Sequence, residues 1–227
     1  SYRTALIALS VMSPSAAAHP AWRVAVLRAL EKNKKHMPYA KYFQLATVKP
    51  DGKPANRTVV YRGFRGDTAD VTVVTDLRSE KVAQIRANPA AEFAWYFPDS
   101  REQFRIAGDL VVVDKDGPEA LAGERRAAWN RMSPGGKAQF EWPTPGFPRL
   151  DDEEAKEGGG GGDPFDVDDE KTRQGSPASE NFCYVVMTVN EVDHLSLRTN
   201  RRYHHVRSRE EGAEGDGGGW VTTEVNP

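Results

Sequence analysis

Hydrophobic and polar residues alternate along much of this chain, and the alternation predicts strands. Period-two patterning, typical of a strand with one buried face, covers residues 42–48, 55–64, 70–76, 90–97, 103–114, 182–189, 202–208 and 217–225. Helical spacing of apolar residues instead predicts amphipathic helices over residues 20–35, 79–88 and 118–131. Because closure removes exposed strand edges, many short antiparallel strands with a few helices predict a small barrel of mainly β (α+β) class.

The first three strands are expected to form an antiparallel meander. Asp51 and Gly52 separate the first two strands and are a strong hairpin signal. A second short turn, at residues 65–69, precedes the third strand. Such a meander excludes the Rossmann type of phosphate site, which needs parallel strands and a glycine-rich turn.

Composition divides the chain into unequal parts. Hydrophobic residues, counted without glycine, make up 38% of the chain. Residues 151–173 hold ten acids and three bases, which leaves 28 bases and 23 acids elsewhere. We predict a flexible N-terminal segment over residues 1–19, a core domain over 20–150, a disordered acidic, glycine-rich insertion over 151–180, and C-terminal strands over 181–227 that complete the barrel.

Charge and residue type exclude several classes of partner. The excess of bases is too small and too scattered to indicate a nucleic-acid partner, and it favours an anionic small ligand. No stretch reaches the roughly 20 apolar residues of a membrane helix, so we expect a soluble intracellular protein. The single cysteine, Cys183, lies in an apolar run and is interpreted as a buried core thiol. The five histidines show no metal-ligand spacing.

A group of cations and hydroxyls is the clearest chemical signal in the sequence. Arg57 and Arg62 lie on one predicted strand, Thr75 ends the next, and Ser79 and Lys81 begin a helix. Neighbouring strands of a meander would bring these side chains to a helix N-terminus, whose free N–H groups bind anions. The combination suits a dianionic monophosphate. The simpler alternative is that Ser79 only caps its helix and that the bases are solvated surface charges.

The order of these motifs resembles a known family. The succession "NRTVVYRGF", "VVTDLRSEKVAQIRANP", "FAWYF" and "REQFRIAG" is similar to the FMN-binding core of the pyridoxamine 5′-phosphate oxidase family, most clearly over residues 40–114. The resemblance implies an antiparallel six-stranded split β-barrel with FMN as its cofactor. It also implies a C2 homodimer with the site between two subunits, and an FMN-dependent oxidoreductase with a small-molecule substrate, which in the oxidases is a vitamin B6 phosphate.

The same resemblance implies which residues contact the flavin. The cofactor-binding residues would be Arg57, Thr58, Val59, Val60, Arg62, Thr75, Arg78, Ser79, Lys81, Gln103 and Gln139. Glu80 and Glu102 stand where the family oxidases carry bases. Arg78 would therefore have to supply the missing charge beside the phosphate.

The substrate residues of the family match this chain less closely. An Arg-x-His pair of the oxidases corresponds here to Arg201 and Tyr203, with His205 just beyond and Leu195 in place of an indole. The resemblance implies that Arg201 binds the anion of the substrate and that Tyr203 or His205 lies near the flavin ring as a catalytic group. Three functions stay open: an FMN-dependent oxidase or reductase, a flavin-binding module for redox sensing or assembly, and a barrel that binds haem or another tetrapyrrole.

Overall fold

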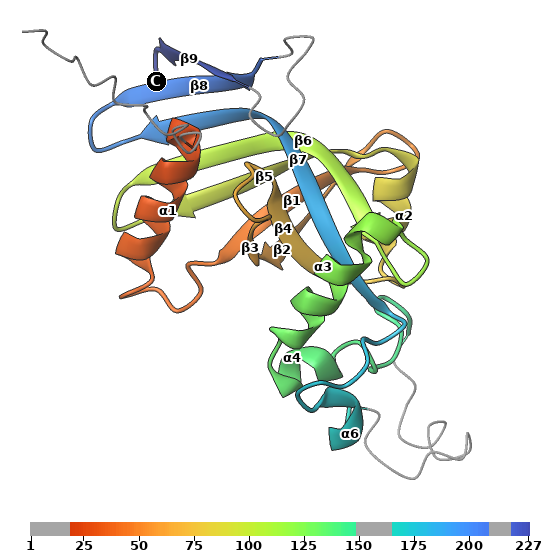
Figure 1. Cartoon of the computed structure of the whole chain (residues 1–227). Coiled ribbons are helices and arrows are strands. Elements are labelled where there is room, and N and C mark those ends of the chain that lie inside the picture. The colour runs from red at the N-terminus through yellow and green to blue at the C-terminus, as the bar shows by residue number, and fades with distance from the viewer. Residues whose placement is uncertain (1–18, 149–164, 209–218) are drawn as a thin grey trace, which may run out of the picture.

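One antiparallel sheet of nine strands, curled into a half-barrel with helices at its flanks, dominates the computed structural model (Figure 1), which describes residues 19–148, 165–208 and 219–227. The elements are α1 (Ala21–Asn33), β1 (Tyr42–Val48), β2 (Pro54–Val60), β3 (Gly63–Phe64), β4 (Val71–Asp76), α2 (Glu80–Ala87), β5 (Ala90–Phe97), β6 (Glu102–Val113), α3 (Glu119–Asn130), α4 (Pro134–Ala138), α6 (Asp169–Thr172), β7 (Phe182–Ser196), β8 (Arg201–Arg207) and β9 (Trp220–Val225). The predicted mainly β, antiparallel class is confirmed.

Strand order departs from the expected meander. The order is β2-β1-β5-β6-β7-β4-β3, with β8 paired to β7 and β9 paired to β8. The hairpin between β1 and β2 forms as predicted, with Gly52 at φ +81° in its turn. However, β4 pairs with β7 and lies at the other end of the order from β2. The predicted three-stranded meander therefore forms only in part: residues 63–64 of the second predicted strand pair with β4 as β3, but β4 pairs over its whole length with β7, more than a hundred residues later in the chain.

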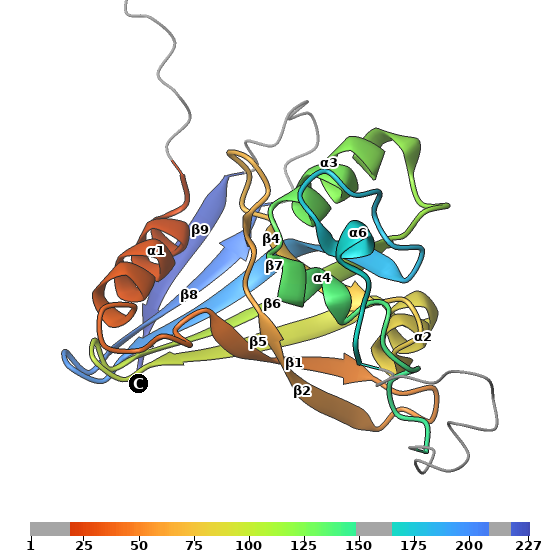
Figure 2. The same ribbon diagram turned by 90° about the horizontal axis from the view of Figure 1, so that it is seen from below.

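The flanking helices gather at opposite ends of the sheet. The first helix, α1, lies with the β8–β9 hairpin at one end, and α3, α4 and α6 lie at the other (Figures 1 and 2). Each end has its own apolar cluster: Trp22 and Val26 of α1 join the main core, whereas Trp129 of α3 packs with Phe140 and Phe182 in a second one. Among the described residues, no helix is long and apolar enough to cross a membrane.

Strand β5 shows how the period-two pattern separates core from surface. Phe93, Trp95 and Phe97 point into the main core and are almost fully buried, whereas Tyr96 points outward and is 46% exposed. The aromatic run therefore fills the barrel with three of its rings. The fourth lies on the outer face of the sheet.

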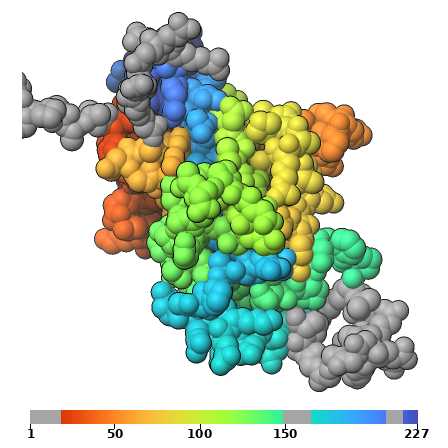
Figure 3. Space-filling model, turned by 45° about the vertical axis from the view of Figure 1, so that its right-hand side comes forward, coloured from red at the N-terminus to blue at the C-terminus, as the bar shows by residue number. Residues whose placement is uncertain are grey.

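Part of the acidic segment is ordered, contrary to the prediction from composition. Within the expected insertion, residues 165–180 are described, and they lie against α3 and α4 (Figure 3). The indole Nε1 of Trp129 donates to the carbonyl oxygen of Ser176 at 2.9 Å, and the buried Lys137 Nζ donates to the carbonyl oxygen of Arg173 at 2.9 Å. A few buried polar contacts thus hold a segment of low hydrophobicity. The rest of the predicted insertion and of the N-terminal segment, residues 151–164 and 1–18, lies outside the described residues.

A glycine allows the two longest strands to approach at a bulge. The register between β6 and β7 shifts between Ala107 and Gly108. A Cβ atom at Gly108 would lie 2.1 Å from the carbonyl oxygen of Thr188, so only glycine fits without moving backbone.

We expect Gly108→Ala to lower the free energy of unfolding by about 1–3 kcal/mol, because the added methyl group must displace the backbone of β7. The matched control is Gly123→Ala in α3, where a Cβ meets nothing within 4 Å and where alanine should add about 0.5–1 kcal/mol through its helix propensity. Urea unfolding of both variants measures the difference. Equal midpoints for the two would contradict the bulge argument.

Candidate functional site

A group of hydroxyls and a buried ammonium surrounds the beginning of α2. Lys81 Nζ donates to Thr75 Oγ1 at 3.0 Å, and Thr75 Oγ1 lies 3.3 Å from Ser79 Oγ. Ser79 is the N-cap residue, but its hydroxyl donates to the carbonyl oxygen of Asp76 and accepts nothing from the helix. Val82 N–H already donates to the carbonyl oxygen of Ser79 at 2.9 Å, so the N–H groups of Glu80 and Lys81 are the ones left for an anion, which the helix dipole also favours.

A second cation, Arg57, reaches the same place from β2. Its Nη1 donates to Thr47 Oγ1 at 2.6 Å and its Nη2 to Gln84 Oε1 of α2 at 2.9 Å. These bonds fix the guanidinium between the sheet and the helix. We call Arg57, Thr75, Ser79 and Lys81 the cationic cluster.

The two positive charges of the cationic cluster are offset only through space, by the carboxylate of Glu80 for Arg57 and that of Asp76 for Lys81. Neither Arg57 nor Lys81 forms an ion pair with another described residue. Burial, and secondly the charge of Arg57, lower the pKa of Lys81, and burial lowers the pKa of Arg57. Burial is the main cause of both shifts, and a bound dianion would offset it as well as the repulsion between Arg57 and Lys81.

Arg78 and Gln139 lie next to this cluster, and Arg78 is already engaged. Its Nε and Nη2 bind the carboxylate of Asp76, at 3.0 and 2.7 Å. Its Nη2 also donates to the carbonyl oxygen of Phe140 at 3.3 Å, which places Gln139, at the end of α4, beside the start of α2. Most of the hydrogen-bond donors of Arg78 are therefore already bonded to other residues of the chain.

The remaining residues expected at the flavin divide between the two faces of the sheet. Val59 is buried in the main core. Thr58 and Val60 alternate with it toward the outer face, and Val60 pairs with the exposed Tyr42. Gln103 is half-buried and lies between Tyr96 of β5 and Leu195 of β7. The neighbouring Glu102 accepts from the buried ring of His194 at 3.0 Å, so this acid has a structural partner.

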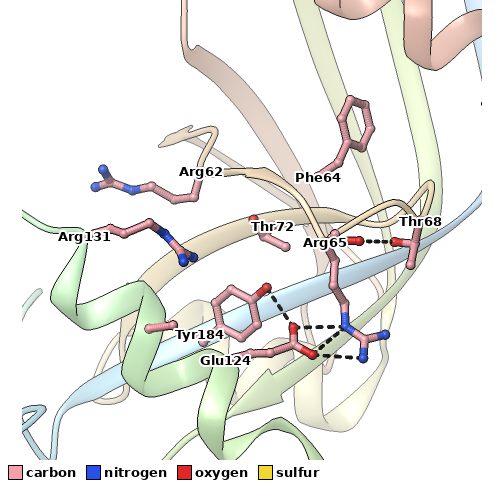
Figure 4. Close-up of a pocket in the computed structure, with 10 residues that line it drawn as sticks. Arg62, Phe64, Arg65, Thr68, Thr72, Glu124, Arg131 and Tyr184 are labelled. Atoms are coloured by element: carbon pink, nitrogen blue, oxygen red, sulfur yellow. Dashed lines mark hydrogen bonds and ion pairs between the residues drawn. The ribbon is translucent and has the colours of Figure 1, made fainter.

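Arg62 lies away from the cationic cluster, at a cavity of about 640 Å³ between the β3–β4 region and α3 (Figure 4). The lining residues are Arg62, Phe64, Arg65, Gly66, Thr68, Thr72, Glu124, Ala127, Arg131 and Tyr184. The guanidinium groups of Arg62 and Arg131 make no side-chain hydrogen bond or ion pair with another described residue, and burial lowers the pKa of Arg62. Two unpaired cations at one cavity are typical of an anion site.

Sequence reasoning missed most of this cavity. Glu124, Ala127 and Arg131 come from the helix predicted over residues 118–131, and their spacing of three and four places them on one helix face. This spacing is the sequence feature that could have indicated the cavity. Tyr184 comes from β7, whose partner strands could not be inferred from the sequence.

The residues expected at the substrate lie far from the cationic cluster within one chain. Thr75 pairs with Cys183 on β7, and Arg201 pairs with Ser196, thirteen residues further along that strand. At about 3.3 Å per residue the path along β7 between these two positions is roughly 40 Å, and the curl of the sheet makes the direct distance shorter. Arg201 is exposed and forms two hydrogen bonds with Glu224, at 2.8 and 2.6 Å.

His205 and Tyr203 alternate with Arg202 and His204 on β8. The ring of Tyr203 lies between those of His194 and His205, with centroids 6.1 and 6.3 Å away. His205 is buried, its Nδ1 lies 2.9 Å from Thr222 Oγ1, and its Nε2 has no partner among the described residues. Burial lowers the pKa of this ring to about 4.

Comparison with known proteins adds a family model and several relatives. The model described as "Pyridoxamine 5'-phosphate oxidase, FMN-binding domain" matches residues 19–114. Pyridoxine/pyridoxamine 5′-phosphate oxidase 2 of Arabidopsis thaliana is 32% identical over 208 residues, which cover 91% of this chain and 96% of the relative.

Two solved structures have the same fold. A pyridoxamine 5′-phosphate oxidase-related, FMN-binding protein from Nostoc punctiforme superposes with a TM-score of 0.75 at 38% identity, covering 92% of this chain and all of that one. PhzG from Burkholderia lata superposes with a TM-score of 0.65 at 17% identity, covering 90% of this chain and 92% of that one, and this likeness concerns the fold alone.

The donor set of the cationic cluster fits the phosphate group of FMN. One guanidinium, one ammonium, two hydroxyls and a free helix N-terminus can all approach a phosphate monoester. Arg57 and Lys81, which form no ion pair with a described residue, provide the electrostatic part of that fit.

Stability should fall in acid because of His205. Its folded-state pKa of about 4 lies below the ordinary value of about 6.5, so the unfolded chain binds this proton more readily. The free energy of unfolding therefore decreases as pH falls from about 6.5 to 4. We expect His205→Asn to lose less of its melting temperature between pH 7 and pH 4.5 than the wild type. His19→Asn, at an exposed histidine, should behave as the wild type; identical pH profiles for all three proteins would refute the assignment.

Proposed function

The chain belongs to the pyridoxamine 5′-phosphate oxidase, FMN-binding family, and we propose that it is an FMN-dependent oxidase acting on a small phosphorylated amine or alcohol of the vitamin B6 phosphate type. The observation that carries the proposal is that two groups of cations form no ion pair with a described residue: the cationic cluster, and Arg62 with Arg131 at the cavity. One suits the phosphate of the cofactor, and the other suits the phosphate of a substrate.

The cofactor of the family is FMN. When bound, FMN supplies a two-electron acceptor for oxidation of an amine or alcohol carbon and passes the electrons on to dioxygen. In our proposal Arg57, Lys81 and the first turn of α2 hold its phosphate, and Gln103 on the outer face of β6 orients its ring. No side chain of the chain needs to act as a covalent nucleophile.

The substrate anion would bind between Arg62 and Arg131. Both guanidiniums lie at one cavity, and neither donates a side-chain hydrogen bond to another residue in the part of the chain that the structure describes. Supporting this assignment, the name of the Arabidopsis relative specifies pyridoxine and pyridoxamine 5′-phosphates as its substrates. Each is a small molecule with one phosphate group.

A second copy of the chain would complete the site. Arg201, Tyr203 and His205 are roughly 40 Å from the cationic cluster along β7, so the same chain cannot bring both to one flavin. In a C2 homodimer the same surface of each subunit meets its counterpart, and the β8 residues of one copy could then approach the flavin held by the other.

One observation favours a second function, a flavin-binding module without turnover. Arg201 Nε and Nη2 both donate hydrogen bonds to the carboxylate of Glu224. An arginine so engaged binds a substrate anion less strongly. Measured turnover decides between the two functions.

The first experiment separates cofactor binding from the charge of its phosphate. We expect Lys81→Met to weaken FMN binding about 10- to 100-fold, since a hydrogen bond to a charged group contributes about 1.5–3 kcal/mol. Riboflavin, which lacks the phosphate, should bind to the variant as it does to the wild type.

In the wild type, FMN affinity should fall as pH rises through the lowered pKa of Lys81, because the neutral amine no longer attracts the dianion. Flavin fluorescence titration measures both. Lys53→Met in the exposed β1–β2 turn is the control, and equal losses for FMN and riboflavin would contradict the phosphate assignment.

The second experiment tests turnover and the shared site together. The FMN-loaded chain should oxidise pyridoxamine 5′-phosphate under air with release of hydrogen peroxide. Arg201→Ala and Lys81→Met should each be impaired, and a mixture of the two should regain about a quarter of the wild-type rate, because half of the random dimers are mixed and each has one intact site.

Absence of peroxide from the FMN-loaded wild type would favour the module without turnover. Turnover without recovery in the mixture would instead show that each chain carries its own complete site. Each variant mixed with itself is the control for the mixing procedure.

A further inference from the structure

The guanidinium of Arg57 is held in place by neutral groups. None of its acceptors among the described residues carries a charge: they are the carbonyl oxygens of Leu45 and Ala55, Thr47 Oγ1 and Gln84 Oε1. Arg78, by contrast, is held by the carboxylate of Asp76. Arg57 is therefore oriented without a direct ion pair.

Gln84 and Thr47 form a buried triangle with this guanidinium. Arg57 Nη1 donates to Thr47 Oγ1 at 2.6 Å and Arg57 Nη2 donates to Gln84 Oε1 at 2.9 Å. Thr47 Oγ1 in turn donates to Gln84 Oε1 at 2.6 Å. Gln84 is 5% exposed and Thr47 is 1% exposed. Because both neighbours donate to the amide oxygen, the guanidinium cannot turn away without weakening the pairing of buried polar groups.

Part of the guanidinium stays available to a ligand. A guanidinium carries five N–H groups. Both hydrogens of Nη1 face acceptors and Nη2 donates to Gln84, whereas Nε donates to no residue in the part of the chain that the structure describes. The Nε–H group and one N–H of Nη2 are therefore left, and an arginine binds a phosphate through two such groups.

Gln84 belongs to the same helix as the rest of the cationic cluster. It lies three residues after Lys81 in α2, a spacing that puts both side chains on one helix face. Lys81 also donates to a neutral acceptor, Thr75 Oγ1. One helix thus fixes the ammonium, the free N–H groups of its first turn and the orientation of Arg57 relative to one another.

We infer that Gln84 is a positioning residue for the phosphate group of the cofactor: with Thr47, its neutral amide oxygen orients the Arg57 guanidinium and leaves the positive charge for the phosphate. The inference deepens the proposed function and rests on it in taking the cationic cluster as the FMN phosphate site. A carboxylate at the same place would also orient Arg57, but it would compete with the phosphate for the same charge.

The exchange of the amide for a carboxylate tests the inference directly. We define the phosphate preference as the dissociation constant of riboflavin divided by that of FMN, both measured on the flavin-free chain by fluorescence titration. Gln84→Glu should lower the phosphate preference about tenfold, because a carboxylate bonded to Arg57 opposes the binding of a dianion. Riboflavin should bind to this variant as it does to the wild type. An unchanged phosphate preference in Gln84→Glu would overturn the inference.

Gln84→Met distinguishes positioning from a merely structural role. Methionine has a similar length but offers Arg57 and Thr47 no oxygen, so this variant should melt at a lower temperature than Gln84→Glu when both are flavin-free. It leaves Arg57 charged, so its phosphate preference should nevertheless fall less than that of Gln84→Glu. A merely structural role predicts the opposite order, with the less stable variant showing the lower phosphate preference, and that order would overturn the inference.

Arg57→Met shows whether Gln84 acts through the guanidinium. If it does, Gln84→Met lowers the phosphate preference of the wild-type chain and leaves that of the Arg57→Met chain unchanged. A further loss in the Arg57→Met chain would show that Gln84 acts by another route, against the inference. Gln174→Glu, which adds the same charge at an exposed position, is the control and should keep the wild-type preference.

The outcomes separate this inference from the proposed function. If pyridoxamine 5′-phosphate is not oxidised but Gln84→Glu lowers the phosphate preference, the proposed oxidase activity falls and the inference stands. If oxidation occurs and Gln84→Glu keeps the wild-type preference, the inference falls alone. If Lys81→Met also keeps that preference, the phosphate does not bind at the cationic cluster, and the inference falls together with the phosphate assignment.

Discussion

The backbone pairing of β7 is the constraint on which the rest of the structure depends. This strand of fifteen residues pairs with β6 along almost its whole length, with β4 through its first part and with β8 through its last part. Because strand hydrogen bonds fix register, β7 places Thr75 at one end of the half-barrel and Arg201 at the other. The bulge at Gly108 adjusts the β6–β7 register between those two ends. The separation of the cationic cluster from the β8 residues is therefore built into the sheet.

A second feature of the molecule is that some of its positively charged side chains form no ion pair with another described residue. Most arginines of the described residues are engaged: Arg65 with Glu124, Arg78 with Asp76, and Arg202 with Asp193. Arg57, Lys81, Arg62 and Arg131 form no ion pair with a described residue. Arg57 and Lys81 are partly buried, whereas Arg62 and Arg131 are exposed. Holding partly buried cations without an ion pair opposes folding, and it creates a site where an anion is bound strongly.

The part of the candidate site that could be predicted consists of residues that lie close together in the sequence. Ser79 and Lys81 are close in sequence and open one helix, so their neighbourhood follows from helix geometry. Arg57 was placed with them for the wrong reason, since β2 and β4 are not paired. It reaches the cluster because α2 packs across the sheet and Gln84 binds both Thr47 and Arg57. The cavity was not predicted, since Arg131 and Tyr184 meet only through the packing of α3 on β7.

By itself the sequence determined most of the strands, the three longer helices, the hairpin at Gly52 and the family. These are set by short-range periodicity, by turn residues and by the order of motifs, all of which are readable along one chain. Only the tertiary structure decided which strands pair, that residues 165–180 pack through Trp129 and Lys137, and which charges stay unpaired. The physical reason is that these outcomes depend on contacts between residues far apart in the chain, whose free energy no local pattern records.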